Sequence, residues 1–309
     1  MSMTPSRYAA IEAGGTKFVC ALGDAQGHLL ERVRIPTRDP AGTLAETCEW
    51  LHGASARLGA FDAIGIGSFG PVELDLASPR YGQLLRTPKP GWSDTDLLAP
   101  LAQFNVPLAL DTDVNAAALA ECRWGAGRDV QDLVYVTVGT GIGAGVVVRG
   151  QPLHGLLHPE LGHLRPRRHP LDDGFEGVCP YHGDCFEGLA NGPALVMRLG
   201  CELSDAPSGH PVWEIEADYL GQLCAQIALA FSPQRIVLGG GVMQHERLFA
   251  PLRARMRHWL GGYLARPQLE QDIDAYVVAP GLGDDSGILG ALSLAYRAEA
   301  ETAKIRQPL

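Results

Sequence analysis

A short apolar run, a turn rich in glycine and threonine, and a second apolar run follow one another twice in this chain, far apart in the sequence. The first copy has its apolar runs at 8–11 and 18–22, and the second has them at 133–138 and 144–148. Short apolar runs bounded by glycine are typical of buried strands, so each copy predicts two strands joined by a tight turn. The separation is too long for a solenoid repeat, and we interpret the copies as the cores of two similar lobes.

Strands alternate with helices in the later part of each half, which indicates α/β layers. A chain of 309 residues is also long for one compact core, and this favours two lobes. Ser93 with Asp96 resembles a capping box, so we expect a helix there that continues through Phe104. The other strands are expected at 29–35, 63–67, 106–110, 235–238 and 275–279, and the other helices at 43–58, 114–124, 193–199, 213–231, 245–260 and 287–300.

The charge balance is acidic, with 25 Lys and Arg, 35 Asp and Glu, and a formal net charge of −10. A negative surface repels phosphate backbones, so no nucleic-acid partner is expected. No apolar run approaches the roughly 20 residues that span a bilayer, and residues 1–7 are polar, unlike a signal peptide. The seven cysteines are odd in number and mostly scattered, as is typical of reduced thiols. We therefore expect a cytoplasmic protein without a membrane partner.

The two glycine-rich turns, Gly14-Gly15-Thr16-Lys17 and Gly139-Thr140-Gly141, are candidate phosphate sites. A phosphate needs several backbone N–H donors close together, and glycine permits that approach because it has no side chain. The hydroxyl groups of Thr16 and Thr140 could add donors. Each turn is alternatively an ordinary tight hairpin, where glycine is common. Neither turn has the Gly-Lys-Ser/Thr run that opens the helix of a Walker loop.

Candidate ligand groups also follow two other predicted strands. Gly239-Gly240-Gly241 lies between a strand and a helix, where glycines would let a flat ring lie against the backbone or, alternatively, allow close helix–sheet packing. Asp111 and Asp113 follow the strand at 106–110 and start a helix. In phosphoryl transfer to an alcohol an Asp commonly accepts the hydroxyl proton, and an Asp also commonly caps a helix. We expect one Asp in each role, and the local sequence leaves open which is which.

Three candidate zinc ligands, Cys179, His182 and Cys185, lie close together in an irregular stretch of the chain. Thiolate and imidazole groups suit tetrahedral zinc, and a fourth protein ligand would make a closed, structural site. The candidates for this fourth ligand are His154, His158, His163 and His169. The alternative is two buried thiols and a surface histidine.

Polar residues on either side of this stretch could bind a sugar: Glu160, His163 and Glu187. Carboxylates and an imidazole recognise sugar hydroxyls well because each accepts or donates hydrogen bonds directionally. Glu160 and Glu187 are alternatively ordinary solvated charges.

Together, and in this order along the chain, these motifs resemble the ROK family of sugar kinases, from about Ile11 to Ala291. The resemblance implies a two-lobed actin-like ATPase (ribonuclease H-like) α/β fold with a cleft between the lobes. It places one lobe at 1–115 with a C-terminal helix at 287–309, and the other at 116–286 with a zinc-binding loop at 158–188. It also implies ATP with Mg²⁺, a structural Zn²⁺ and a homodimer.

The resemblance also implies roles for particular residues. The turns at 14–17 and 139–141 become the two phosphate motifs, and Gly239, Gly240 and Gly241 become the adenosine motif. The catalytic base falls on Asp113, and the zinc ligands become His163, Cys179, His182 and Cys185. The implied sugar-binding residues are Ser68 and Gly70 in the loop at 67–71, together with Thr112, Asp113, Glu160, His163 and Glu187.

Three departures from the common family pattern favour the fructokinase branch. Many members have Asp at Glu12, Asn at Thr112 and a third Cys at His182. The expected reaction is therefore phosphorylation of D-fructose to fructose 6-phosphate, with Asp113 as general base. Glucose, mannose and N-acetylhexosamines are the alternative substrates, because the sequence does not display the shape of the pocket.

Two other functions fit parts of the pattern. Sugar-responsive repressors of this family carry an N-terminal helix-turn-helix, for which the first strand, starting by Tyr8, leaves no room. An actin-like filament protein or chaperone-type ATPase would have no use for the candidate sugar and zinc residues. Both functions are therefore disfavoured.

Overall fold

The computed structural model describes residues 6–306, so the expectations for 1–5 and 307–309 lie outside the described residues. The chain divides into two compact units. Unit 1 comprises the residues up to Gly125, Pro152–His158 and the residues from Asp285 onward. Unit 2 comprises Ala126–Gln151 and Pro159–Asp284. The seven residues Pro152–His158 thus belong to unit 1, although the residues on both sides of them belong to unit 2. The sequence did not indicate this assignment.

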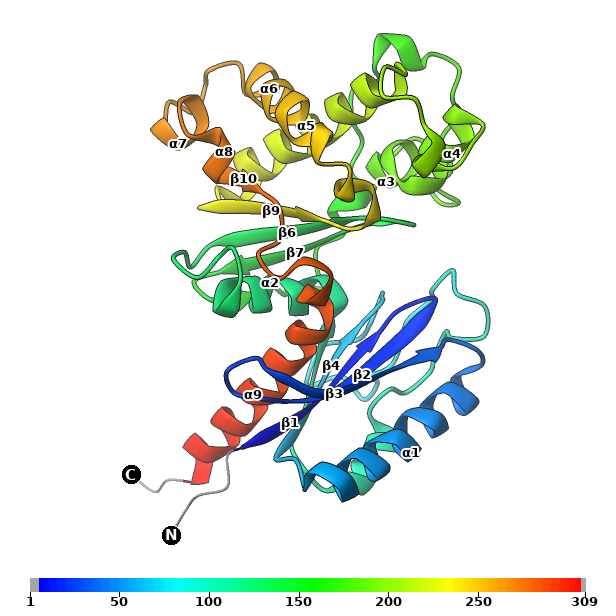
Figure 1. The fold of residues 1–309 in the computed structure, drawn as a ribbon, viewed down its shortest axis with the longest axis vertical. Coiled ribbons are helices and arrows are strands. Elements are labelled where there is room, and N and C mark those ends of the chain that lie inside the picture. Colours follow the sequence, from blue (N-terminus) through cyan, green and yellow to red (C-terminus); the bar gives the residue numbers. More distant parts are fainter. Residues whose placement is uncertain (1–5, 307–309) are drawn as a thin grey trace. The chain divides into compact units, whose positions relative to one another are not determined.

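Unit 1 contains a five-stranded sheet in the order β3-β2-β1-β4-β5. Its strands are β1 (Arg7–Ala13), β2 (Lys17–Asp24), β3 (Leu29–Pro36), β4 (Ala63–Ser68) and β5 (Leu108–Thr112). The first three strands form an antiparallel meander, whereas β4 and β5 run parallel to β1. Helix α1 (Pro40–Leu58) covers one face of the sheet, and α9 (Ser286–Arg306) covers the other (Figure 1).

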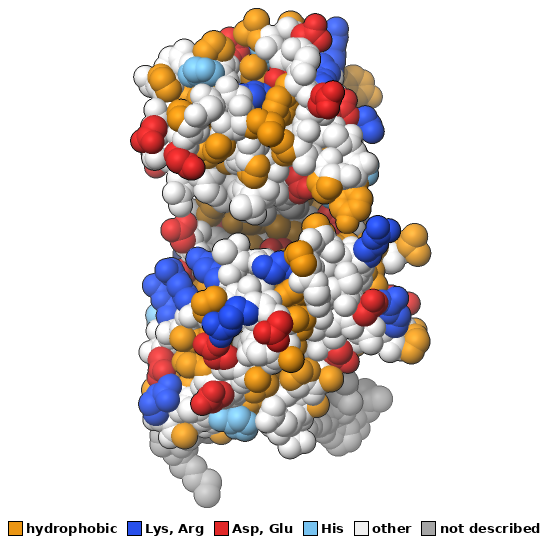
Figure 2. Space-filling model, turned by 90° about the vertical axis from the view of Figure 1, so that its right-hand side faces the viewer, with side chains coloured by type: hydrophobic (Ala, Val, Ile, Leu, Met, Phe, Trp, Pro, Cys, Tyr) orange, Lys and Arg blue, Asp and Glu red, His pale blue; other side chains and the backbone are white. Residues whose placement is uncertain are grey.

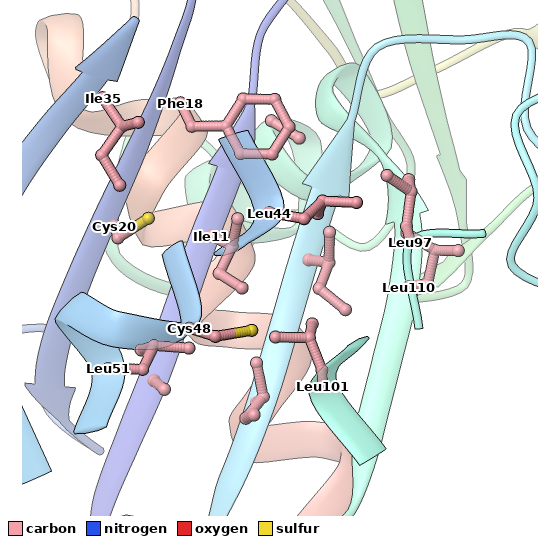
Figure 3. Close-up of a cluster of buried hydrophobic side chains, with 14 of the residues drawn as sticks. Ile11, Phe18, Cys20, Ile35, Leu44, Cys48, Leu51, Leu97, Leu101 and Leu110 are labelled. Carbon is pink, nitrogen blue, oxygen red and sulfur yellow. The ribbon is translucent and has the colours of Figure 1, made fainter. Parts of the chain in front are cut away.

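The face of the sheet toward α1 holds the core of unit 1 (Figure 3). Helix α1 begins where the side chain of Asp39 accepts a hydrogen bond from Gly42 N, with Pro40 in the first turn. Leu44, Cys48 and Leu51 follow at helical spacing and pack on the strands, so burial of this apolar stripe stabilises the helix.

Helix α2 (Asp113–Trp124) belongs to unit 1, and the boundary therefore falls near residue 125 rather than at the expected 115. The cause is close packing of α2 on α9. A Cβ added at Gly290 of α9 would lie 2.3 Å from the carbonyl carbon of Ala116, so glycine is what permits this approach.

Unit 2 repeats the arrangement, with the strand order β10-β9-β6-β7-β8. The strands are β6 (Leu133–Val138), β7 (Ile142–Val148), β8 (Gln151–Pro152), β9 (Arg235–Gly239) and β10 (Val277–Val278). β6 pairs antiparallel with β7 and parallel with β9, just as β1 pairs with β2 and β4. The two strand–turn–strand copies predicted from the sequence are therefore confirmed, and each is the centre of a mixed sheet.

Unit 2 also contains α-helices of very different lengths. They are α3 (Phe186–Ala190), α4 (Gly192–Leu199), α5 (Val212–Phe231), α6 (Phe249–Leu260), α7 (Pro267–Glu270) and α8 (Ile273–Tyr276). The longest, α5, packs against α6, where a Cβ added at Gly221 would lie 2.9 Å from the carbonyl oxygen of Leu252.

Two predicted elements differ from the structure. Instead of a helix from 93, residues 99–104 form a 3-10 helix, η1 (Ala99–Phe104), and Asp94 has a positive φ of 62°. Asp96 Oδ1 accepts hydrogen bonds from Leu98 N and Ala99 N just before and at the start of η1, whose N-cap is Leu98, so the capping box assigned to Ser93 is wrong. The strand expected at 275–279 is shortened to β10, because α8 occupies the preceding residues.

None of the helices within residues 6–306 combines the length and apolar character needed to cross a membrane. On the face shown in Figure 2, Lys and Arg side chains are interspersed with Asp and Glu side chains. Such a mixture of charges is typical of a surface exposed to water.

Candidate functional site

Three parallel strands of unit 1 end at one edge of its sheet. Ala13 at the end of β1 pairs with Ser68 at the end of β4, and Ser68 pairs with Thr112 at the end of β5. The first glycine turn, the loop after Ser68 and Asp113 therefore all start from this edge. Ligands of α/β proteins bind at such carboxyl ends of strands.

The turn at 14–17 is both a hairpin and an accessible loop. Gly14 N donates to the carbonyl oxygen of Lys17 at 3.1 Å, and a Cβ added at Gly14 would lie 2.7 Å from that oxygen. Glycine is thus required at 14 by the hairpin itself. Gly15 has nothing within 4 Å of an added Cβ, and the residues Gly15, Thr16 and Lys17 are exposed. The exposed part of the turn leaves room for a phosphate.

Glu12 lies beside this turn, and its carboxyl group interacts electrostatically with that of Asp113. The pKa of Glu12 is raised to about 7, mainly by burial and in addition by the nearby Asp113 carboxylate, while Lys17 opposes the shift. The carboxyl group also lies against the start of α9, since a Cβ added at Gly287 would be 2.4 Å from Glu12 Oε1. A divalent cation near this pair of carboxylates would favour their charged forms.

Thr112, rather than an Asp, caps helix α2. Its Oγ1 accepts a hydrogen bond from Asn115 N at 3.1 Å, so the expectation that Asp111 or Asp113 is the N-cap is wrong. Asp111 is buried and accepts hydrogen bonds from Thr112 N, from Asn115 Nδ2 and, at 3.1 Å, from His154 Nε2. Asp113 is the first residue of the helix, is half-buried, and accepts from Val114 N at 2.9 Å. Of the two carboxylates, that of Asp113 is the more accessible.

The loop after β4 is stabilised by a hydrogen bond within the loop and by contacts with His158. Ser68 is buried and its hydroxyl donates to the carbonyl oxygen of Phe69. Val72 N donates to His158 Nε2 at 3.3 Å, and a Cβ added at Gly70 would lie 3.3 Å from His158 Cε1. His158 is therefore a support of this loop rather than a candidate metal ligand.

In unit 2 the second glycine turn lies beside Glu187. Gly139 N donates to the carbonyl oxygen of Gly141, and Ile142 N donates to Glu187 Oε2 at 3.1 Å. A Cβ added at Gly141 would lie 2.6 Å from that Glu187 oxygen, so glycine is needed for the carboxylate to reach the turn. Asn191 Nδ2 donates to the carbonyl oxygen of Thr140, a contact that the sequence did not indicate.

The glycines at 239–241 lie at the same edge of the sheet as this turn, because Gly239 pairs with Thr137 near the end of β6. Gly240 has φ of 91°, and an added Cβ would lie 2.4 Å from the carbonyl oxygen of Val138. Close packing thus explains Gly240. Gly241 has nothing within 4 Å of an added Cβ and can accept a neighbouring ligand.

Glu160 and Glu187 lie near each other in unit 2. The pKa of Glu160 rises to about 7 because protein atoms crowd its carboxyl group and because the Glu187 carboxylate is close, although part of the residue stays exposed. The short helix after Glu160, η2 (Leu161–His163), packs on β7, where an added Cβ at Gly162 would be 1.9 Å from the carbonyl oxygen of Ile142. This packing brings the predicted sugar residues of unit 2 to its glycine turn.

Four candidate metal ligands converge in unit 2: His163, Cys179, His182 and Cys185, whose ligand atoms all lie within 4.8 Å of one another. His163 Nδ1 is 3.8 Å from Cys179 Sγ and 3.6 Å from Cys185 Sγ, and His182 Nδ1 is 3.7 Å from Cys179 Sγ. Tetrahedral zinc, with bonds of about 2.3 Å to sulfur and about 2.0 Å to nitrogen, places its ligands roughly 3.5 Å apart. The arrangement therefore fits zinc.

The other histidines considered as a fourth ligand are engaged elsewhere. His154 contacts Asp111, His158 contacts Val72, and His169 Nδ1 accepts from Leu171 N. Spacing alone had left His163 as one of four candidates, whereas the packing of η2 on β7 brings it to the two cysteines.

Two mixed α/β sheets, each with a glycine turn at its ligand-binding edge, define the actin-like ATPase class of folds. The chain belongs to the ROK family, whose model matches residues 8–298. The predicted fold class is confirmed by solved structures. A ROK hexokinase from Thermus thermophilus is 30% identical with a TM-score of 0.76, covering 96% of this chain and 99% of that one. A ROK glucokinase from Streptomyces griseus, in complex with glucose and AMPPNP, is 27% identical with a TM-score of 0.73, covering 95% and 100%.

Curated relatives match over nearly their whole length. A fructokinase from Pediococcus pentosaceus is 46% identical, covering 94% of this chain and 97% of the relative. A putative fructokinase from Bacillus subtilis is 44% identical, covering 96% and 98%. A ROK family transcriptional regulator shares the fold, with a TM-score of 0.77 at 22% identity.

Proposed function

We propose that this protein is an ATP-dependent fructokinase, which phosphorylates D-fructose to fructose 6-phosphate. One observation carries the choice of sugar. Relatives named fructokinase are 36% to 46% identical to this chain, whereas relatives named glucokinase are 26% to 27% identical over similar coverage. Glucose, mannose and N-acetylhexosamines are the alternative substrates.

Asp113 is the proposed general base. It accepts the proton of the sugar's 6-hydroxyl as that oxygen attacks the γ-phosphoryl group of ATP. Asp111 is the poorer candidate, because its carboxylate is buried and already accepts three hydrogen bonds. General-base assistance of this kind contributes roughly 10²–10⁴-fold to the rate.

The proposed phosphate-binding residues are those of the turns at 14–17 and 139–141, and 239–241 is the proposed adenosine motif. The open space at Gly15 and Gly241 supports this proposal. Magnesium bound with ATP neutralises charge on the transferred phosphoryl group. Glu12 is the proposed group that orients this magnesium, because burial and the nearby Asp113 carboxylate raise the pKa of Glu12 to about 7 and a bound cation would favour both charged forms.

The proposed sugar-binding residues fall at both ligand edges described above. They are Ser68, Gly70, Thr112 and Asp113 in unit 1 and Glu160, His163 and Glu187 in unit 2. Structural zinc is proposed at the His163 cluster. Since His163 faces the two thiols with Nδ1, its Nε2 is the nitrogen that binds a sugar hydroxyl, and zinc then serves to orient the imidazole.

The proposal is tested by an ADP-release assay with fructose, glucose, mannose and N-acetylhexosamines, with NMR to locate the phosphate ester. The expected result is the highest kcat/KM with fructose and an ester at carbon 6. Release of ADP that no sugar accelerates would overturn it. The homodimer and the cytoplasmic location expected from the sequence stay predictions.

A further inference from the structure

Residues Pro152–His158 are attached to the rest of unit 1 through two histidines, His154 and His158. His154 Nε2 lies 3.1 Å from Asp111 Oδ1, and His158 Nε2 accepts from Val72 N at 3.3 Å. His154 thus contacts the end of β5, just before Asp113, and His158 contacts the loop that contains Gly70. We call this segment, residues 152–158, the strap.

The contact of His154 with Asp111 extends to the first turn of α2. Asp111 Oδ1 also accepts from Asn115 Nδ2 at 2.8 Å, and Asn115 Nδ2 lies 3.4 Å from His154 Nε2. Asn115 N in turn donates to the Thr112 cap. Asp111, Thr112 and Asn115 are all buried, so the residues on both sides of Asp113 are tied into one network.

An ionised Asp111 carboxylate can only accept hydrogen bonds, so His154 bonds to it only with a proton on Nε2. Asp111 is buried, with 3% of its side chain exposed, and a carboxylate there is costly unless its oxygens are hydrogen-bonded. His154 supplies its donor from a side chain that is 38% exposed. Because the donor comes from the strap and not from the sheet, the strap contributes directly to holding the Asp111 carboxylate.

We propose that His154 is a positioning residue, which orients Asp113 through the Asp111–Asn115 network and so couples the strap to the phosphoryl-transfer step. This inference rests on the proposed kinase function and assigns no direct contact between His154 and substrate. His158 attaches the same strap to the loop after β4, through Val72 N. The proposal predicts that loss of the His154 donor lowers kcat much more than it raises KM for fructose.

The test compares His154→Leu with His154→Gln, whose side-chain amide can still donate to Asp111. His154→Leu should lower kcat roughly 10- to 100-fold, because small displacements of a reacting group have effects of this size. His154→Gln should recover kcat to within about threefold of the unmodified enzyme. His52→Ala is the matched control, since it removes an exposed histidine hydrogen bond to Gln103 in the same unit and should leave kcat unchanged. Equal kcat for His154→Leu and the unmodified enzyme, or equal losses in the Leu and Gln variants, would overturn the proposal.

A second measurement does not depend on activity. Nitrogen-15 NMR of the imidazoles should show His154 carrying a proton on Nε2 at pH 7, and this signal should change in Asp111→Asn. In His154→Leu, amide hydrogen exchange at Val114 and Asn115 should accelerate while exchange in α1 stays unchanged. An Nε2 without a proton, or unchanged exchange in α2, would overturn the network. If the unmodified protein phosphorylates no hexose, the proposed function fails while these two measurements still decide whether the network exists.

Discussion

The carboxyl group of Glu216 should lower the free energy of unfolding, and this effect should become larger as the pH rises. Glu216 lies on α5 and is fully buried, and within the described part of the chain neither of its oxygens has a hydrogen-bond partner. Burial raises its pKa well above the ordinary value, Arg198 opposes the shift and Asp172 adds to it. Arg198 already binds Asp172 through two N–H groups, at 2.8 Å and 2.7 Å, so it compensates Glu216 only weakly.

The pH dependence follows from the proton that the folded state retains. In the unfolded chain Glu216 ionises near its ordinary pKa of 4.5, whereas the folded state holds the proton to higher pH. Between these two pKa values the folded state binds one proton more, so the free energy of unfolding falls by roughly 1.4 kcal/mol for each pH unit. Glu216→Met removes this slope together with an unsatisfied polar group, which costs about 1–3 kcal/mol.

The assay is thermal and urea unfolding of Glu216→Met and the unmodified protein at pH 5, 6, 7 and 8. The variant should be more stable, and its advantage should grow with pH. The matched control is Glu214→Met on the same helix, which removes an exposed ion pair with Arg255 and should change stability by less than about 1 kcal/mol, without that trend. Destabilisation of Glu216→Met at every pH, or an advantage that does not grow with pH, would refute the reasoning.

Three further predictions test other parts of the structure. In the unmodified enzyme, KM for MgATP should decrease as the pH rises from 6 to 8, because the Glu12 pKa of about 7 leaves more carboxylate at higher pH. In Glu12→Gln this pH dependence should be absent. Cys185→Ser should lower bound zinc, measured by mass spectrometry, and raise KM for fructose through loss of His163 orientation. Gly240→Ala should lower stability by about 1–3 kcal/mol, since φ is 91°, whereas Gly241→Ala, with open space, should not.

The sequence predicted the two sheets well because their cores depend on local signals. Apolar runs such as 133–138 and the glycine turns that follow them are contiguous in the chain, and the structure has strands at both copies. Strand pairing in the structure then brings Ser68 and Asp113 to the same edge as the first turn, since parallel strands end together.

The features that the sequence missed depend on contacts between distant residues. The cap of α2 was assigned to an Asp, because Asp and Thr are both good caps and only the backbone geometry selects Thr112. His154 was considered only as a metal ligand, since its contact with Asp111 requires the excursion of the strap into unit 1. The positive φ of Asp94, which delays the helix expected from 93, has no local sequence signal either.

The role of Asp113 is tested most directly by Asp113→Asn, which keeps the shape of the side chain and removes its ability to accept a proton. Turnover of fructose and ATP is measured by ADP release, and fructose binding is measured separately by calorimetry. The account predicts that kcat falls by at least about 10²-fold while the Kd for fructose changes by less than about threefold. A kcat within a few-fold of the unmodified enzyme would contradict it.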